Sequence, residues 1–415
     1  MKLTLRRLFV MLAPVGLIGC SAMSVPVGTS AVATANASFV QPIPGLTAEQ
    51  VAQFNRGRQL FEHRFAPSEG LGPLYNQVSC ATCHGSFPDT GSGSIDTNML
   101  VGGFSKGEVT SLVEAGGPAV RLHAIDGVPL EGIPMDAKFI SQRISPPTFG
   151  LGLIEAIPSD DIAARLADDA TRDALGIHGQ ANWEFGEVGR FGWKANKGDL
   201  TEMVQNACEF EMGLSSPARP REDFPDVPPQ VLASPANLND AAHPFVKAFF
   251  DAKASLGIPQ AQTDLSQQQV DDLVSFPRFQ APPSPLPLTN QAQLGQHLFT
   301  SVHCAACHVP SMKTGPNNLG VPSGLDVPAY SDLLIHDMGP GDSDGLIMNV
   351  ATGQQWRTAP LWGLRYRTEY MHDGRAGTLD QAIQDHGGEA AKVVDAYNAL
   401  SPDQRAAIIA FLKSL

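Results

Sequence analysis

Aromatic residues and positive charge are both scarce in this sequence. Aromatics make up 7% of its 415 residues, and alternating runs of β-branched residues are few, which argues against an all-β fold. Lys and Arg number 28 against 42 Asp and Glu, a formal net charge of −14. So acidic a surface repels nucleic acid phosphates, which excludes that class of partner. It suits a basic partner protein, although the same charge also keeps a protein in solution.

The rest of the composition is that of a folded protein. Hydrophobic residues make up 43% of the chain, enough for a sizeable core. The length predicts two or three domains. The 40 Gly and 33 Pro residues predict long loops between helices. The expected fold class is therefore mainly all-α, with long loops.

The start of the chain is typical of an exported protein. Basic residues within 2–7 precede an apolar stretch, 8–19, which is too short to span a bilayer. The stretch ends at Cys20 in a Leu-Ile-Gly-Cys sequence that resembles a bacterial lipobox. We predict a lipoprotein signal peptide over 1–19 and a flexible tether over 20–45. The alternative is an ordinary signal peptide, cut slightly later.

Both readings of the N-terminus predict the same compartment. The protein would lie in the bacterial periplasm or at the outer membrane. As a lipoprotein it would contact a membrane only through the lipid on Cys20.

Two copies of Cys-x-x-Cys-His, Cys80–His84 and Cys304–His308, carry the clearest chemistry. A zinc site or a redox disulfide would not require the adjacent His in both copies. One helical turn instead places two thiols under the vinyl groups of a haem, and the following His faces the iron. We therefore predict two covalently bound haem c groups. The attachment residues are Cys80, Cys83, Cys304 and Cys307, and the proximal ligands are His84 and His308. Cys208 is left over, and we predict that it is a buried structural thiol.

The haem motifs belong to a longer internal duplication. Each copy opens with a Gly-x-x-Leu-Phe helix, continues through its haem motif and a Pro-x-aromatic-Gly-Leu segment, and closes with a helix. The paired segments are Gly57–Phe61 with Gly295–Phe299, Pro147–Leu151 with Pro360–Leu364, Trp193–Leu200 with His372–Leu379, and Leu265–Phe276 with Leu400–Phe411.

The helix starts of this duplication carry capping signals. Thr47 with Gln50 predicts a capping box. Ser266 and Ser401 are natural N-caps, and Pro402 suits the first helical position.

A proline-rich stretch separates the two copies. Residues 277–287 hold five prolines within a short span, which is typical of a stiff extended linker. We therefore predict two fused cytochrome c-like domains, 46–276 and 288–415, the first enlarged by insertions.

Four further segments resemble the dihaem c-type oxidoreductases, a family of thiol oxidoreductases and peroxidases related to the bacterial dihaem cytochrome c peroxidases. The resemblance covers nearly all of the expected mature chain. It is specific for the family but not for one reaction, because members of the superfamily differ in chemistry. The matching segments are 146–158, 189–195, 333–339 and 371–379.

The resemblance implies that the C-terminal haem transfers electrons and has a second axial ligand. Peroxidases have Met at the matching place, where this chain has His386. We predict ligation by His308 and His386. The alternatives for the second ligand are Met338, Met348 and Met371.

The N-terminal haem is the catalytic candidate, because no second ligand is obvious near His84. The family's distal acid matches Glu211, which would move a proton between the two oxygens of a peroxide. Peroxidases of the superfamily also have a Gln upstream of this acid. Met203 falls near the matching position, with Gln205 close by, so the residues expected on the open side of this haem match the family only in part. The residues His123, Met99 and Met135 are the alternatives that would close this iron.

Trp193 matches a tryptophan that lies between the two haems in relatives, and we predict that it relays electrons. Haem propionates need cations, for which the candidates are Arg190, Lys194, Arg357 and Arg375. Relatives also hold calcium between their domains, but its ligand pattern is not clear in this sequence.

The expected function is a dihaem oxidoreductase that passes electrons from the C-terminal haem to the N-terminal haem and reduces hydrogen peroxide. Its partners would be a small-molecule substrate and a cytochrome c or cupredoxin-like electron donor. The alternatives are an electron carrier without catalysis, and an oxidase or oxygenase acting on an organic or thiol substrate.

Overall fold

The computed structural model describes residues 40–85, 99–104, 119–130, 137–167, 169–220, 244–256 and 263–415. These residues all fall within one compact unit, Ser38–Leu415. The predicted signal peptide and most of the predicted tether lie outside the described residues. Within the described parts of the chain, every helix is too short or too polar to cross a membrane.

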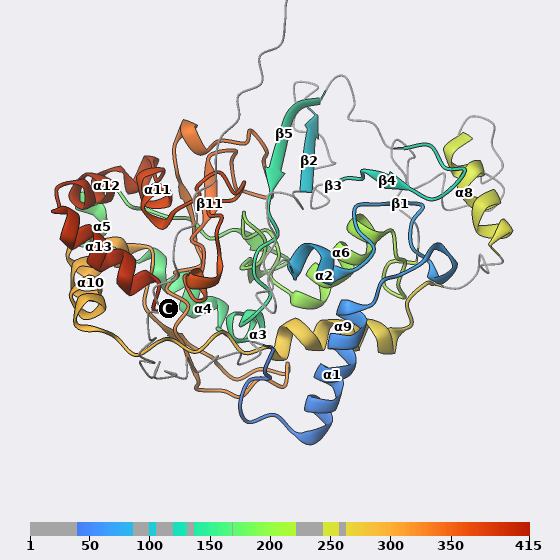
Figure 1. Ribbon diagram of the computed structural model, residues 1–415, viewed down its shortest axis with the longest axis horizontal. Helices are drawn as coiled ribbons and strands as arrows, with labels where there is room; N and C mark the ends of the chain where they lie inside the picture. Colours follow the sequence, from blue (N-terminus) through green and yellow to red (C-terminus); the bar gives the residue numbers. More distant parts are fainter. Residues whose placement is uncertain are drawn as a thin grey trace, which may run out of the picture. The chain divides into compact units, whose positions relative to one another are not determined.

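The fold is mainly α-helical, as predicted, with long loops and short strands (Figure 1). The helices are α1 (Ala48–Glu62), α2 (Cys80–His84), α3 (Leu151–Glu155), α4 (Ser159–Ala163), α5 (Ala170–Leu175), α6 (Leu200–Met212), α8 (Pro244–Ser255), α9 (Gln267–Phe279), α10 (Asn290–Ser301), α11 (Leu379–Gln384), α12 (Ala391–Asn398) and α13 (Pro402–Leu412).

The strands form small antiparallel sheets. They pair as β1 (Leu74–Tyr75) with β4 (His123–Ala124), β2 (Met99–Phe104) with β3 (Ala119–Val120) and β5 (Ala137–Arg143), β6 (Trp183–Glu184) with β7 (Glu187–Val188), β8 (Met312–Lys313) with β9 (Asp326–Val327), and β10 (Ile335–Asp337) with β11 (Gln355–Arg357).

The predicted capping signals are confirmed. The Thr47 hydroxyl accepts a hydrogen bond from the Gln50 N–H at 3.2 Å, and the Gln50 side chain accepts one from the Thr47 N–H at 2.9 Å. Ser266 and Ser401 form the same box at the starts of α9 and α13, with Pro402 as the first residue of α13. These caps satisfy N–H groups that have no partner inside a helix.

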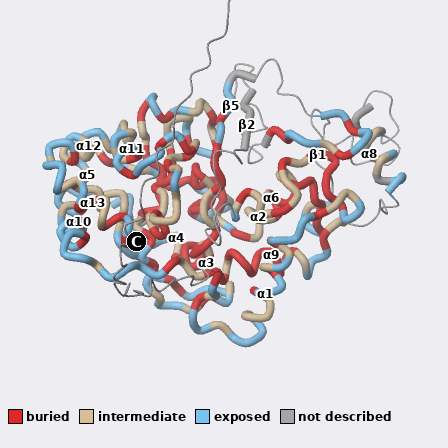
Figure 2. The backbone as a smooth tube through the Cα atoms, in the orientation of Figure 1, coloured by how far each residue is buried: buried red, intermediate tan, exposed pale blue. Residues whose placement is uncertain are grey.

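In each copy of the duplication, the opening helix packs on the closing helix. Helix α1 lies against α9, and α10 lies against α13. Both pairs meet at a glycine: a Cβ on Gly57 would overlap the carbonyl of Asp272, and one on Gly295 would overlap the carbonyl of Ala407. Helix α9 is buried along most of its length, whereas α10 is largely exposed (Figure 2).

The Pro-x-aromatic-Gly-Leu segments of the two copies pack against each other. Gly150 and Gly363 have φ of +73° and +74°, a conformation that favours glycine. A Cβ on Gly150 would overlap the ring of Trp362, and one on Gly363 would overlap the ring of Phe149. Each copy therefore places its aromatic ring on the glycine of the other.

The linker prediction differs from the structure at its start. Helix α9 continues through Pro277 to Phe279, three residues into the predicted linker of 277–287. Phe276 and Phe279 are both buried in the larger hydrophobic core, and that burial keeps the last turn helical despite the proline. The domain boundary itself remains a prediction.

We expect Gly295→Ala to lower the free energy of unfolding by about 1–3 kcal/mol, because the added methyl group must push α10 away from α13. Urea unfolding followed by circular dichroism measures this. Gly341→Ala is the control, because a Cβ there meets nothing within 4 Å. Equal midpoints for the two variants would contradict the close helix contact.

Candidate functional site

The first haem motif forms helix α2 at the edge of a cavity of about 250 Å³. Ser79 caps the helix by accepting a hydrogen bond from the Thr82 N–H at 3.2 Å. Cys80, Cys83 and His84 all line the cavity. The Nδ1 of His84 donates to the carbonyl of Pro146 at 3.0 Å. This tautomer places the ring's lone pair on Nε2, as a haem ligand requires.

The second motif begins on a 3₁₀ turn, Cys304–Ala306, beside a cavity of about 200 Å³. Cys304, Cys307 and His308 line it. The Nδ1 of His308 donates to the carbonyl of Tyr330 at 2.9 Å, the same arrangement as at the first motif. Burial, together with the neighbouring His386, lowers the pKa of His308 to about 4, which keeps the ring neutral and able to bind a metal.

His386 lies opposite His308 in this second cavity. The two ring centroids are 6.5 Å apart. With metal–nitrogen bonds of about 2 Å, this separation leaves room for one iron between two imidazoles. The Nδ1 of His386 donates to the carbonyl of Ala382 at 2.6 Å, so its lone pair also resides on Nε2. Of the alternative ligands, Met338 and Met371 line the second cavity, whereas Met348 lines the first.

Helix α6 forms one wall of the first cavity and carries Glu211. The Oε2 of Glu211 accepts a hydrogen bond from the Asn76 side-chain amide at 2.8 Å. Burial raises the pKa of Glu211 to about 7, an effect that the Asn76 hydrogen bond and the charge of Arg121 oppose. A carboxyl group with such a pKa can both release and accept a proton near neutral pH.

The other ligand candidates for the first iron lie elsewhere. His123 is exposed on β4 and does not line the cavity. The side chains of Met99 and Met135 lie outside the described residues. Met203 lines the cavity, while Gln205 is buried away from it. Among the described residues that line this cavity, His84 is the only histidine.

Five of the described residues line both cavities: Trp193, Arg357, Ala359, Pro360 and Arg367. The indole of Trp193 is buried, and its Nε1 donates to the carbonyl of Ile144 at 2.8 Å. The structure therefore places Trp193 in the wall between the two haem motifs.

The two arginines in this wall fit the carboxylates of a haem. Burial lowers the pKa of each to about 10. Within the described residues, Arg357 donates only to backbone carbonyls, including that of Gly192 at 2.9 Å, and the buried Nη2 of Arg367 has no hydrogen-bond partner. Buried cations are normally paired with anions. Haem propionates would supply those anions.

The other predicted propionate partners are engaged elsewhere. Arg190 donates to backbone carbonyls at the end of α3, Lys194 pairs with Asp344 at 3.1 Å, and Arg375 pairs with Asp342. Sequence reasoning missed Arg367. The available signal was its place three residues after the second Pro-x-aromatic-Gly-Leu segment.

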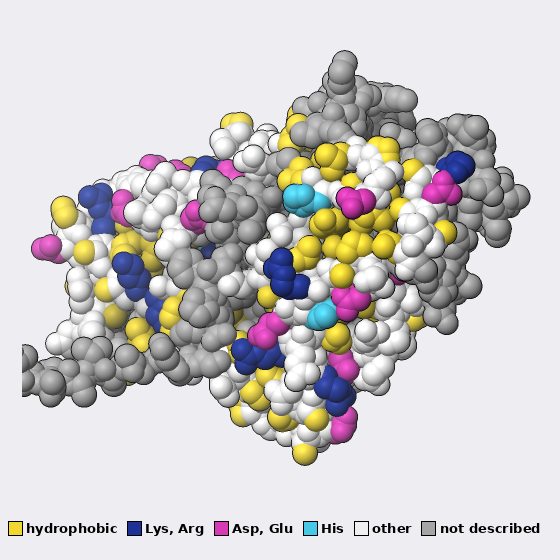
Figure 3. All heavy atoms as spheres, turned by 45° about the vertical axis from the view of Figure 1, so that its right-hand side comes forward, with side chains coloured by type: hydrophobic (Ala, Val, Ile, Leu, Met, Phe, Trp, Pro, Cys, Tyr) yellow, Lys and Arg dark blue, Asp and Glu magenta, His cyan; other side chains and the backbone are white. Residues whose placement is uncertain are grey.

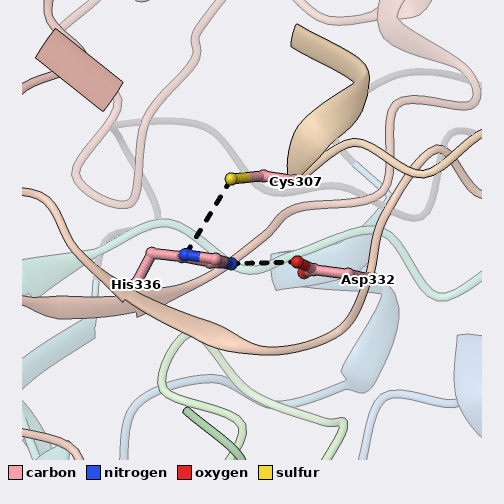
Figure 4. A group of neighbouring side chains, drawn as sticks. All are labelled: Cys307, Asp332 and His336. Atoms are coloured by element: carbon pink, nitrogen blue, oxygen red, sulfur yellow. Dashed lines mark hydrogen bonds and ion pairs between the residues drawn. The ribbon is translucent and has the colours of Figure 1, made fainter. Parts of the chain in front are cut away.

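His336 lies in a cluster with Cys307 and Asp332 (Figure 4). Its Nε2 is 2.9 Å from Asp332 and its Nδ1 is 2.8 Å from Glu389. Although burial opposes it, the charge of Asp332 raises the pKa of His336 well above its usual value. Cys307 belongs to the haem motif and both ring nitrogens are engaged, so the cluster supports the cavity wall rather than a metal ion. Calcium prefers oxygen ligands, so this grouping gives no support for the calcium ion of relatives.

Comparison with known protein families identifies the family of this chain. The family model described as "di-haem oxidoreductase, putative peroxidase" matches residues 133–415. The chain belongs to this family. The match includes the second haem motif and begins after the first. The protein is therefore an oxidoreductase that holds two haems.

Three solved structures show a distant similarity to this chain. Hydrazine synthase from Kuenenia stuttgartiensis is 14% identical, with a TM-score of 0.39 over 98% of this chain and 100% of that one. A MauG-like protein associated with microbial copper homeostasis is 16% identical, with a TM-score of 0.42 over 91% and 93%. The diheme peroxidase BthA from Burkholderia thailandensis is 16% identical, with a TM-score of 0.40 over 91% and 87%. No curated protein matches the chain.

We expect Asn76→Ala to raise the pKa of Glu211 above its value of about 7, because the lost hydrogen bond stabilises the carboxylate. An infrared titration of the carboxyl band in the haem-loaded protein measures the shift. Asn317→Ala is a control, since the Asn317 amide bonds only to nearby backbone groups, those of Gly315, Leu319 and Val321. An unchanged pKa in Asn76→Ala would show that the amide does not hold this carboxylate.

Proposed function

We propose that this oxidoreductase reduces hydrogen peroxide at the His84 haem with electrons supplied by the His308 haem. The observation that carries the proposal is the difference between the two cavities. In the second, His386 faces His308 at a distance that suits two axial ligands. In the first, Glu211 lines the cavity and no described histidine accompanies His84. One iron would be closed and the other open.

The duplication gives a reason for this difference. Each copy has a leucine at the start of a helix, Leu200 at the start of α6 and Leu379 at the start of α11. His386 comes seven residues after Leu379, and Ala207 holds the matching place after Leu200. Ala207 lines the first cavity. A methyl group there would leave space above the first iron, where the second copy supplies an imidazole.

Cys80, Cys83 and His84 would hold the first haem, and Cys304, Cys307, His308 and His386 the second, with thioether bonds to the four thiols. A bound haem would supply the electrons and the iron at which a peroxide binds. Reduction consumes two electrons and two protons per peroxide and yields two waters. Two axial imidazoles suit a centre that transfers electrons rather than one that binds a substrate.

Glu211 would move the proton that this chemistry needs. Its Oε2 is held by Asn76, so Oε1 is the oxygen that would take a proton from one peroxide oxygen and return it to the other. The raised pKa of about 7 suits a group that must act as both base and acid. Trp193 lines both cavities and would carry electrons between them.

Partner and location follow from the sequence. The net charge of −14 favours a basic electron donor of the small cytochrome c or cupredoxin-like kind. On the face shown in Figure 3, hydrophobic side chains gather and charges of both signs are scattered around them. The preference for a basic donor therefore rests on the net charge of the whole chain and not on an acidic patch on this face. The signal peptide, residues 1–19, would direct the protein to the periplasm, and a lipid on Cys20 would anchor it through the tether, residues 20–45.

A carbon monoxide titration of the fully reduced protein tests the open site. We expect one carbon monoxide per wild-type chain, and none in Ala207→His, because the new imidazole would occupy the free position of the first iron. Ala207→Leu is the control for added bulk without a ligand, and we expect it to keep a high-spin first haem. No binding by the wild type would favour an electron carrier without catalysis. Binding without peroxide turnover would favour an oxidase or oxygenase.

We expect peroxide turnover to depend on the protonation of Glu211. The carboxyl must be ionised to accept the first proton, so activity should rise as the pH increases through about 7 and fall away below it. Glu211→Gln should lower kcat by roughly 10²–10⁴ and remove this pH step. Stopped-flow assays with a reduced donor measure both. Glu209→Gln, two residues away on α6, is the control. A Glu211→Gln variant with wild-type turnover would remove Glu211 from the mechanism.

A further inference from the structure

The sequence His386-Gly387-Gly388-Glu389 forms a tight turn beside the second cavity. It links the end of α11 to α12, and its second half is the 3₁₀ turn Gly388–Ala390. His386 and Glu389 both line the cavity. The turn therefore ends, three residues after the proposed ligand, in an acidic side chain on the same cavity wall.

The two glycines let this turn lie directly on the end of strand β10. A Cβ on Gly388 would overlap the carbonyl of Asp337, and Gly388 has a φ of +53° that few other residues adopt. A Cβ on Gly387 would come within 2.7 Å of the carbonyl of Met338. Any larger residue at these positions would lift the turn off the strand. His386 would move with it, because it immediately precedes Gly387.

Glu389 fixes the turn to two other segments of the chain. Its Oε2 accepts hydrogen bonds from the N–H groups of His178 and Gly179, at 3.0 and 3.1 Å, and from the Nδ1 of His336 at 2.8 Å. Its Oε1 accepts from the N–H of Asp337 at 3.2 Å. Four donors converge on one carboxylate that is only 15% exposed.

The partners of Glu389 are themselves fixed. His336 is held on its other nitrogen by Asp332 and lies 3.8 Å from the sulfur of Cys307, part of the haem motif. Gly179 has a φ of +64°, and a Cβ there would overlap the His336 ring. The carboxylate thus connects the turn that carries His386 to the attachment side of the same cavity.

We propose that Glu389 is a positioning residue that holds His386 over the second iron. Gly387 and Gly388 allow the close backbone contact with the end of β10 that this position requires. The inference rests on the proposed ligation of the second haem by His308 and His386. Loss of the Glu389 hydrogen bonds would release His386 and leave that iron open to an external ligand.

The test is the number of carbon monoxide molecules bound by the reduced, haem-loaded chain, read with the low-spin absorption spectrum. His386→Ala defines full opening and should bind one more than the wild type. We expect Glu389→Ala and Gly388→Ala to approach that value. Glu389→Gln should fall between wild type and Glu389→Ala, because an amide facing these donors keeps at most three of the four hydrogen bonds.

Two matched controls separate this role from a general loss of structure. Lys392→Ala removes a hydrogen bond of 2.8 Å to the carbonyl of Ala174, which also joins the α12 region to the segment around α5, yet should leave carbon monoxide binding unchanged. Gly377→Ala adds a methyl group where a Cβ meets nothing within 4 Å and should also match the wild type. Circular dichroism confirms folding of each variant.

The outcomes decide between the proposals. If folded Glu389→Ala and Gly388→Ala keep the wild-type spectrum while His386→Ala gains a carbon monoxide, the positioning role is wrong. If His386→Ala gains none, His386 is not the ligand and the inference fails with that assignment. The proposal that the first iron is open is tested separately, by the number of carbon monoxide molecules that the wild-type chain binds.

Discussion

The structure depends on the reciprocal contact between the two Pro-x-aromatic-Gly-Leu segments. Each glycine has a positive φ and lies under an aromatic ring of the other copy, so the contact holds only when both glycines are present. The prolines that begin these segments line the cavities, Pro147 the first and Pro360 both. Because close-packed interiors resist small shifts, this contact fixes the distance between the two haem motifs. Trp193, Arg357 and Arg367 come to lie in a shared wall as a consequence.

Buried charge lies in that shared wall and directly next to it, at Lys194, which follows Trp193 in the chain. Lys194 is fully buried, and its ammonium is held by Asp344, by three backbone carbonyls and by the face of Trp356 at 4.0 Å. Its charge is therefore balanced within the protein. Among the described residues, Arg357 donates to backbone carbonyls, and Arg367, although near Glu369, keeps a buried Nη2 without a hydrogen bond. Burying a cation without a hydrogen-bonded anion is costly, so the propionates of two bound haems would stabilise the wall that separates them. The cofactor and the fold would then depend on each other.

Features that depend on a few neighbouring residues could be predicted from the sequence. The two attachment motifs, the three N-caps and the opening and closing helices are each contained in a few neighbouring residues, and the structure places them as expected. Features that arise only in three dimensions were not foreseen. Arg367 and Glu389 are ordinary charged residues in the sequence, and their importance comes from what lies around them. The helical course through Pro277 was missed because burial of Phe276 and Phe279 outweighs the local effect of proline. The family assignment is borne out, whereas the site roles remain proposals.

A duplicated scaffold can support two different iron sites through few changes. Both copies carry the same Cys-x-x-Cys-His motif and orient its His by the same kind of carbonyl hydrogen bond, to Pro146 in one and Tyr330 in the other. The difference lies on the facing side. In the second copy the helix ends early, at Gln384, and the turn that follows supplies an imidazole. In the first, α6 continues to Met212, presents the small Ala207 at the matching place, and delivers a carboxylate one turn later. The length of one helix would thus decide whether an iron is closed by a ligand or left open beside a proton carrier.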